Sequence, residues 1–448
     1  MPLATLAGSA AMYAGLPGGV FKSVLKYEDA KQGVRIAPFA LMRRPVTNAE
    51  FLAFVTANPQ WRRDQVASVL AEPRYLSHWE SATSLGPRAL PQQPVTQVSW
   101  FAASAYCESL DARLPTWSEW EYAAAADETR RDARRDPAWR ERILTWYSTP
   151  SNKPLQRAGL QMPNAYGIQD LHGLVWEWTE DYSSLLVSAD NRDQGRPGQD
   201  TVLWGWRALG GRSRKLCGDD ARGDALVAGR ARHHRQPWIP MREEPAMKPV
   251  SLLLTALLAA TMTAIASPAT TALPKDSVYQ LPVRLTDQSG KTWAWSARRG
   301  RPQIVAMFYT SCQYICPLIV DSGKAVERTL TPGERANMGI LLVSMDPARD
   351  TPDALTAVVK KRGLDTRQWT LASPAPSQVR DVANVLGVRF RKLEDGEFNH
   401  TSALILLDAD GRVVARTEQV GSKADPEFLQ EVRRVSHEGP GAVRPQGR

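Results

Sequence analysis

Apolar positions are arranged most regularly after residue 274. The apolar run 304–309 has the length of a buried strand, and segment 340–345, which is apolar except for Ser344, is predicted to be a second one. Segments 403–407 and 412–415 flank Asp410-Gly411, which is a hairpin signal. The predicted helices follow the first strand to about Thr329, cover residues 353–362 and 377–386, and begin again at Pro426 behind its cap Asp425. Because strands alternate with helices, we predict an α/β domain whose central sheet is covered by helices.

The first 200 residues have a different pattern, with clustered tryptophans and short apolar blocks. Thr116 is the predicted N-cap of a short helix that contains Trp120. Trp176 and Trp178 are two positions apart, so in an extended segment they share one face and Glu177 lies on the other. We interpret these aromatic residues as the core of a fold poor in regular structure rather than as catalytic residues.

Residues 250–266 carry no charge, follow Met247-Lys248 and end in the small-residue motif Ala264-Ile265-Ala266. A basic start, an apolar centre and an A-x-A site predict a signal peptide or signal anchor over residues 247–273. The alternative, a buried helix of one globular protein, is disfavoured because the segment has no polar face. Basic residues precede the segment, so an intact chain would keep its first half in the cytoplasm and place its second half in the periplasm, membrane-anchored or exported.

Composition narrows the classes of function. A chain of 448 residues is long enough for two or three hydrophobic cores. The formal net charge is +9, but the arginines are dispersed and no aromatic-basic stripe accompanies them, so we predict no nucleic-acid partner. Only four cysteines occur, which excludes a disulfide-stapled scaffold.

The strongest chemical signal is a pair of cysteines behind the first predicted strand. Cys312 and Cys316 are four residues apart at the start of the following helix, so one helical turn brings both sulfurs to the same side. A helix N-terminus lowers the pKa of a thiol and favours the thiolate. Two thiolates and the imidazole of His400 suit copper, Cu(I) in particular. Taken alone, the cysteine pair also fits a disulfide or two buried thiols.

These residues, the loop Asp346-Pro347-Ala348-Arg349-Asp350-Thr351-Pro352 and the Asn399-His400-Thr401 segment resemble the Sco/SenC copper-chaperone family of thioredoxin-like proteins. The resemblance implies copper ligation by Cys312, Cys316 and His400, with Asp346 and Asp350 in a loop near the site. It implies delivery of copper to a respiratory or denitrification enzyme such as cytochrome oxidase, nitrite reductase or nitrous-oxide reductase. The alternative is a thiol-disulfide oxidoreductase that reduces metal-site cysteines of a partner through catalytic Cys312 and Cys316.

The first half carries blocks in a characteristic order: Val46-Thr47-Asn48-Ala49-Glu50-Phe51, Arg113-Leu114-Pro115-Thr116, Asn164-Ala165-Tyr166-Gly167 and Trp176-Glu177-Trp178. They resemble the formylglycine-generating, sulfatase-modifying factor family, and most closely its nitrite-reductase accessory branch of the NirV type. This resemblance implies a loop-rich α+β domain like that of C-type lectins. It also implies a role as a binding or scaffold module in nitrite-reductase maturation.

Family membership further implies a calcium site in the first half. The matching positions are Asp170 and Glu177 by side chain and Gly173 and Val175 by backbone carbonyl, an all-oxygen set that suits a hard cation. Oxidase activity is not expected, because formylglycine formation relies on a late pair of cysteines that hold copper. Here Cys107 belongs to an earlier helix block and Cys217 stands alone.

Residues 201–246 do not resemble the end of such a domain, because the family's closing Gly-Phe-Arg run is missing. When residues 233–242 are back-translated with GC-rich codons and one nucleotide is skipped, the run Leu-Gly-Phe-Arg-Cys appears. Our hypothesis is a frameshift near Asp200 that joins two genes, and an authentic linker is the alternative. The predicted organisation is 1–200 sulfatase-modifying factor domain, 201–246 aberrant linker, 247–273 signal segment, 274–436 Sco/SenC domain and 437–448 disordered tail.

Overall fold

The structure is a computed structural model of the chain. It describes residues 12–24, 33–148, 154–186, 224–225, 229–231, 272–312, 315–393 and 395–437. The predicted apolar segment 250–266, the frameshift point and the tail after residue 437 lie outside these ranges. Within them, no helix combines the length and the apolar character that crossing a bilayer requires.

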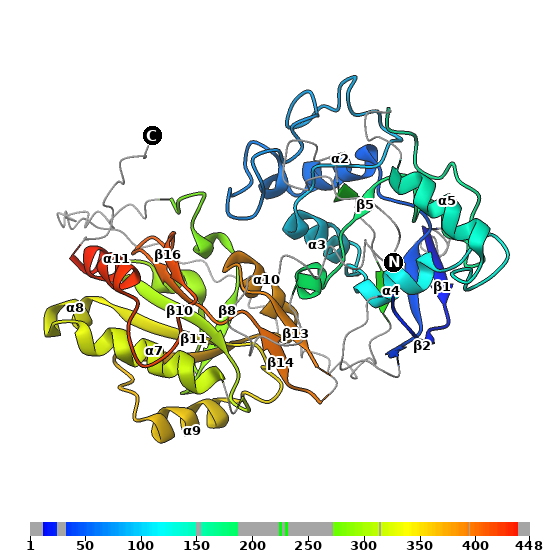
Figure 1. The fold of residues 1–448 in the computed structure, drawn as a ribbon. Helices are drawn as coiled ribbons and strands as arrows, with labels where there is room; N and C mark the ends of the chain where they lie inside the picture. The colour runs from blue at the N-terminus through cyan, green and yellow to red at the C-terminus, as the bar shows by residue number, and fades with distance from the viewer. Residues whose placement is uncertain are drawn as a thin grey trace, which may run out of the picture. The chain divides into compact units, whose positions relative to one another are not determined.

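The N-terminal part is built from short strands connected by long loops (Figure 1). Its strands are β1 (Tyr13–Leu16), β2 (Gly19–Phe21), β3 (Val34–Ile36), β4 (Phe39–Met42), β5 (Trp176–Glu177), β6 (Asp224–Ala225) and β7 (Gly229–Ala231). Strand β4 pairs antiparallel with β1 on one side and β7 on the other, β2 pairs with β3, and β5 pairs parallel with β6. Strand β7 therefore brings a part of the predicted aberrant linker to the edge of β4.

Thr47, Ser99 and Thr116 are N-caps of helices in this part, whereas a further helix begins at Pro137 after Asp136. The helices are α2 (Asn48–Ala57), α3 (Trp100–Ser109), α4 (Trp117–Ala124) and α5 (Pro137–Ser148), with the 3-10 turns η1 (Pro59–Trp61) and η2 (Tyr182–Leu186). Thr116 is the N-cap of α4, as predicted, and it forms a capping box with Glu119. The Thr116 hydroxyl accepts the Glu119 N–H at 3.3 Å, and the Glu119 carboxylate accepts the Thr116 N–H at 2.8 Å. These bonds satisfy backbone groups that the first turn would otherwise leave without partners.

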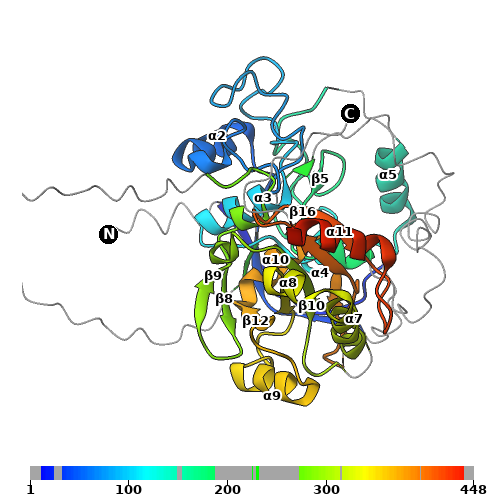
Figure 2. The same ribbon diagram turned by 90° about the vertical axis from the view of Figure 1, so that its left-hand side faces the viewer.

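The C-terminal part is a seven-stranded sheet in the order β16-β15-β10-β11-β12-β8-β9, shown from two directions in Figures 1 and 2. Its strands are β8 (Arg284–Asp287), β9 (Thr292–Ala294), β10 (Gln303–Phe308), β11 (Gly339–Ser344), β12 (Trp369–Pro374), β15 (Leu404–Leu407) and β16 (Val413–Thr417). Strands β10, β11 and β12 are parallel, and every residue of β10 and β11 is buried. This burial explains why both strands are apolar at nearly every position, with Gln303 and Ser344 as the polar exceptions.

Helices cover this sheet as the alternating pattern predicts. They are α7 (Ile315–Thr329), α8 (Pro332–Asn337), α9 (Pro352–Arg362), α10 (Val379–Val385) and α11 (Pro426–His437), with 3-10 turns at η3 (Val278–Gln280), η4 (Trp295–Arg298) and η5 (Pro376–Gln378). Helix α7 packs on β10 and β15, and α9 packs on β12 and β8. Gly363 ends α9 with φ of +58°, a left-handed conformation that glycine adopts without strain.

Two features of this part differ from the sequence prediction. The predicted helix over residues 377–386 is divided into the turn η5 and the shorter α10. A small two-stranded ladder of β13 (Phe390–Lys392) and β14 (Phe398–His400) precedes the predicted hairpin. His400 is thus the last residue of a strand, whereas the sequence pattern placed it in a segment before one.

Candidate functional site

The cysteine loop joins the end of β10 to the start of α7. Cys312 lies in this loop and is half-buried. Cys316 is the second residue of α7, at the helix N-terminus where the backbone dipole favours a thiolate. The Cys316 side chain and residues 313–314 lie outside the described part of the chain. The convergence of the two sulfurs therefore stays a prediction.

His400 closes the strand β14 and is 3% exposed. Its Nδ1 lies 3.1 Å from the Thr401 carbonyl oxygen, which can only accept a hydrogen bond. Nδ1 therefore carries the proton, and Nε2 carries the lone pair that a metal ion requires. Burial lowers the pKa of His400, while the Thr401 carbonyl and the nearby Cys312 raise it.

Tyr309 lies between the two elements that carry these residues. Its hydroxyl donates to the Phe398 carbonyl at 3.2 Å and accepts from the Phe398 N–H at 3.3 Å. Its ring meets His400 edge to face, with the ring centroids 5.9 Å apart. The sequence analysis did not single out Tyr309, although its position at the end of a buried strand and directly before the cysteine loop is a signal that could have identified it.

Asp350 holds the base of the cysteine loop. Its carboxylate is 1% exposed and accepts the Thr310 N–H at 3.0 Å, the Thr310 hydroxyl at 2.5 Å and the Ser344 hydroxyl at 2.5 Å. Burial raises the pKa of Asp350, and the bonds from Ser344 and Thr310 oppose that rise. Asp350 thus connects Ser344, the last residue of β11, to Thr310, which lies just after β10 and two residues before Cys312.

Asp346 lies in the loop after β11, four residues before Asp350. It pairs with Arg349, whose guanidinium also bonds the Gly396 carbonyl in the segment that leads into β14. Glu397 lies 3.9 Å from Arg349 and accepts the Ser311 hydroxyl at 3.5 Å. Both predicted aspartates therefore connect the loop to elements that carry candidate ligands, and neither contact requires either aspartate to be a ligand.

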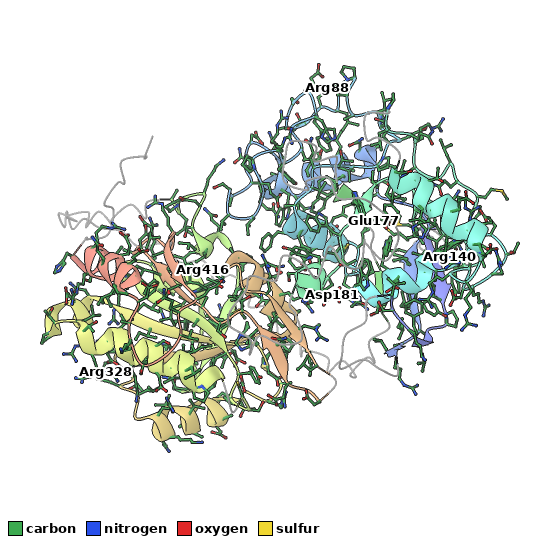
Figure 3. The ribbon with its side chains drawn as sticks, in the orientation of Figure 1. Arg88, Arg140, Glu177, Asp181, Arg328 and Arg416 are labelled. Atoms are coloured by element: carbon green, nitrogen blue, oxygen red, sulfur yellow. The ribbon has the colours of Figure 1, made fainter. Side chains whose placement is uncertain are left out.

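The candidate calcium residues of the N-terminal part lie in the segment that ends in β5. Asp170 is buried with φ of +63°, and its carboxylate accepts the N–H groups of Gly159 and Gln161. Glu177, labelled in Figure 3, accepts the Trp120 indole N–H through Oε2 at 2.5 Å. Glu177 Oε1 is buried, and the described residues offer it no hydrogen-bond partner.

The carboxyl groups of Glu177 and Asp170 both have raised pKa values. The pKa of Glu177 is raised well above its ordinary value, first by burial and further by the nearby Asp170, while the Trp120 bond opposes the rise. Burial also raises the pKa of Asp170. Two neighbouring buried carboxyls and an orphan oxygen fit a hard cation. The described residues contain no cluster of three or more His, Cys, Asp or Glu side chains around one point, so Gly173 and Val175 would have to contribute their carbonyls, as predicted.

The remaining candidates for redox chemistry in the N-terminal part lie apart. Cys107 is fully buried in α3, and burial raises the pKa of its thiol far above the ordinary value, so it is an unreactive thiol. His172 contacts the Ala124 carbonyl at 2.8 Å, whereas His78 contacts Gln97 at 3.3 Å. Cys217 lies outside the described residues.

Trp176 and Trp178 have different surroundings. Trp178 donates its indole N–H to the Val98 carbonyl at 2.8 Å and packs on Tyr182. Trp176 is 45% exposed and packs on Trp146 and Tyr147 of α5. Trp178 is therefore a packing residue, whereas the exposure of Trp176 shows that its interpretation as a core residue was wrong.

Two different family models match the two halves of the chain. Residues 6–232 match the model of the sulfatase-modifying factor enzyme 1-like domain, and residues 272–436 match the SCO1/SenC model. The first match runs on past the predicted boundary at residue 200, and the exact domain limits stay a prediction.

Curated relatives match the N-terminal half. The formylglycine-generating enzyme of Streptomyces coelicolor is 32% identical over 222 residues, which cover 39% of this chain and 70% of that enzyme. The inactive C-alpha-formylglycine-generating enzyme 2 of Mus musculus is 30% identical over 211 residues, or 37% of this chain and 67% of that protein. The hercynine oxygenase of Mycobacterium tuberculosis is 32% identical over 162 residues, which cover 33% of this chain and only 38% of that enzyme.

Solved structures match the C-terminal half. The structure of Bradyrhizobium japonicum ScoI with copper bound is 26% identical, covers 34% of this chain and 97% of that chain, and has a TM-score of 0.30.

Proposed function

Because the chain belongs to the sulfatase-modifying factor family over residues 6–232 and carries an SCO1/SenC domain over residues 272–436, we propose that its C-terminal domain is a copper-binding metallochaperone. Copper is its cargo, held by Cys312, Cys316 and His400. The recipient is a copper enzyme of respiration or denitrification, such as cytochrome oxidase, nitrite reductase or nitrous-oxide reductase.

One observation supports this proposal above the others. His400 is 3% exposed, its Nδ1 lies 3.1 Å from the Thr401 carbonyl oxygen, and its ring packs on Tyr309, which lies three residues before Cys312. Thiolate and imidazole donors are the ligands that Cu(I) prefers, whereas a pair of cysteines that only exchanges disulfides does not need the imidazole. Cys312 is half-buried, so a partner's thiolate can reach the copper ion and replace the ligands one at a time.

Replacing His400 distinguishes the chaperone from the oxidoreductase. In the full chain, His400→Ala should lose Cu(I) retention in a chelator competition, while exchange with a disulfide probe should continue. His437→Ala is the matched control, because its imidazole is mostly exposed on α11 and contacts Glu334 at 3.2 Å. Unchanged copper affinity in His400→Ala would refute the three-ligand site and favour the oxidoreductase.

For the N-terminal half we propose a binding or scaffold module in nitrite-reductase maturation, with the loop-rich C-type-lectin-like fold of its family. Identity does not decide between activity and inactivity, because the active and the inactive relatives score 32% and 30%. Buried Cys107 cannot supply a reactive thiol, which supports the absence of oxidase chemistry. A cysteine peptide incubated with the copper-loaded chain should keep its mass, and conversion of its thiol to an aldehyde would refute this assignment.

We further propose that residues 250–266 direct the C-terminal domain across the cytoplasmic membrane, with the N-terminal half left in the cytoplasm if the chain is intact. The uncharged stretch and its A-x-A site support this arrangement. The intact mass of the exported product tests it, because cleavage predicts a species that begins near Ser267. Resequencing the gene tests the frameshift near Asp200, and a single intact frame in several isolates would refute that hypothesis.

A further inference from the structure

Tyr309 is the side chain that touches both halves of the candidate copper site. It is 3% exposed and directly follows β10, three residues before Cys312. Its hydroxyl bonds both backbone groups of Phe398, which lies two residues before His400. The site's ligands come from segments that are distant in sequence, so whatever joins these segments sets the distance between the ligands.

The Tyr309 ring adds a second contact to the same strand. It meets the His400 imidazole at 77° with 5.9 Å between centroids, and it packs on the Phe398 ring at 5.1 Å. Such an edge-to-face contact favours one orientation of the imidazole plane. Tyr309 thus contacts the strand that ends in His400 through both its hydroxyl and its ring, while its own backbone leads into the cysteine loop.

The β10–β15 ladder pairs the strands on either side of the site, but it lies beyond the cysteine loop and His400 themselves. Other side-chain contacts between the described parts of the cysteine loop and segment 396–400 are longer. Ser311 and Arg349 both reach Glu397 at the limit of bonding distance, 3.5 Å and 3.9 Å, and Glu397 is 38% exposed. Ion pairs and hydrogen bonds at exposed sites contribute little to stability. The ladder between β13 and β14 pairs His400 with Phe390, which fixes the strand but does not connect it to the cysteine loop.

We propose that Tyr309 is a positioning residue that sets the place of His400 relative to Cys312 and thereby tunes the copper affinity of this chain. The proposal rests on the proposed copper-binding function and adds a residue to it. The proposal gives Tyr309 no role as a ligand, because its hydroxyl bonds the Phe398 backbone on both its donor and its acceptor side. Residues that orient metal ligands typically change metal affinity by about 10- to 100-fold when they are replaced.

Tyr309→Phe in the full chain tests the proposal, because phenylalanine keeps the ring and removes only the hydroxyl. Cu(I) affinity in a chelator competition should fall by about 10- to 100-fold. The thiolate-to-Cu(II) charge-transfer band should shift, because the histidine ligand changes its geometry. Tyr279→Phe is the matched control, since Tyr279 is also 3% exposed in the same domain and its hydroxyl accepts the Gln303 amide N–H at 3.0 Å. This control should keep the affinity and the band of the unsubstituted chain.

A double-substitution cycle separates positioning from general destabilisation. In a His400→Ala background, Tyr309→Phe should cause no further loss of Cu(I) affinity, because the ligand that it positions is gone. An equal loss in both backgrounds, or an equal loss in Tyr279→Phe, overturns the proposal. Unchanged affinity and band in Tyr309→Phe also overturn it and leave the copper function standing. If the unsubstituted chain binds no Cu(I), the proposed function fails, and the role of Tyr309 fails with it.

Discussion

The two candidate metal sites differ both in their donor atoms and in how the chain assembles them. In the N-terminal half, Asp170 and Glu177 come from one short segment and offer hard oxygen donors. In the C-terminal half, Cys312 and His400 come from distant segments and offer soft sulfur and nitrogen donors. The first site depends on a local loop conformation, whereas the second depends on how two strands of the domain are joined.

This contrast explains why different residues support the two sites. The positive φ of Asp170 and its bonds to the N–H groups of Gly159 and Gln161 shape a loop locally. Around the candidate copper site, Tyr309 and Asp350 connect elements that are distant in sequence, through bonds to Phe398 and to Thr310 and Ser344. The metal affinity of a site assembled from distant segments therefore depends on residues that connect those segments, whereas the affinity of a local site does not.

The largest expected effect is the complete loss of copper binding with no change in calcium binding. Cys312→Ser removes a soft donor, so the purified full chain should lose its copper while calcium binding by the N-terminal half is unchanged. Metal analysis after loading with Cu(I) and with Ca²⁺ measures both quantities. Cys107→Ala is the matched control, since Cys107 is a buried thiol of α3 outside the copper corner. Retention of copper by Cys312→Ser would show that the soft site lies elsewhere.

Sequence reasoning succeeds where a local pattern is sufficient. The buried strands β10 and β11 follow from largely apolar segments, and the start of α4 follows from Thr116 and Glu119. The cap Asp425 and the first helical residue Pro426 of α11 were predicted for the same reason. Each of these signals involves residues that are neighbours along the chain.

Features that depend on the tertiary structure were not predicted. Strands β13 and β14 are three residues each, too short for a period-two pattern to reveal them. The contacts of Tyr309 and Asp350 could not be predicted, because the sequence does not show which strand ends lie next to each other. The raised pKa of Glu177 follows from burial beside Asp170, which no spacing in the sequence displays.

The second effect concerns the hydrogen bonds that Asp350 makes at the base of the cysteine loop. Asp350→Ala leaves the Thr310 N–H and two hydroxyls without their buried acceptor, so we expect a loss of about 3 kcal/mol in the unfolding free energy of the C-terminal domain. Urea unfolding followed by circular dichroism measures this loss. Asp353→Ala is the control, because Asp353 is exposed in the first turn of α9 and should cost less than about 1 kcal/mol. Equal effects of both substitutions would show that the Asp350 bonds do not hold the loop.

The third effect concerns the candidate calcium site that contains Glu177. At a calcium concentration 100 times the dissociation constant, binding should stabilise the N-terminal half by about 2.7 kcal/mol, and a chelator should remove this gain. Glu177→Gln should abolish the response, because the amide lacks the charge that a hard cation requires. Glu128→Gln is the control, since that carboxylate pairs with Arg142 at 2.9 Å near the surface. The thermal transition followed by tryptophan fluorescence reports the response. A calcium response that survives in Glu177→Gln would remove Glu177 from the ligand set.

The smallest expected effect is a pH dependence confined to the N-terminal half. Burial lowers the pKa of His172, the bond to the Ala124 carbonyl opposes this shift, and Arg142 adds to it. The unfolded chain therefore binds a proton near the ordinary value of 6.5, whereas the folded chain resists it. The stability that neutral His172 contributes is complete above pH 6.5 and is lost as the pH falls towards the lower folded pKa.

His172→Phe removes this titration and keeps a ring between Trp120 and Trp139, whose centroids lie 5.8 Å and 5.7 Å from that of His172. The fluorescence of these tryptophans should report an unfolding free energy that falls less steeply below pH 6.5 than in the unsubstituted chain. The absolute stability of the variant will be lower at every pH, because the Ala124 carbonyl loses its donor. The slope is therefore the informative quantity, since the lost bond shifts the whole curve while the lost titration changes its shape. Identical slopes in the two proteins would show that His172 is not the group that makes the N-terminal half sensitive to acid.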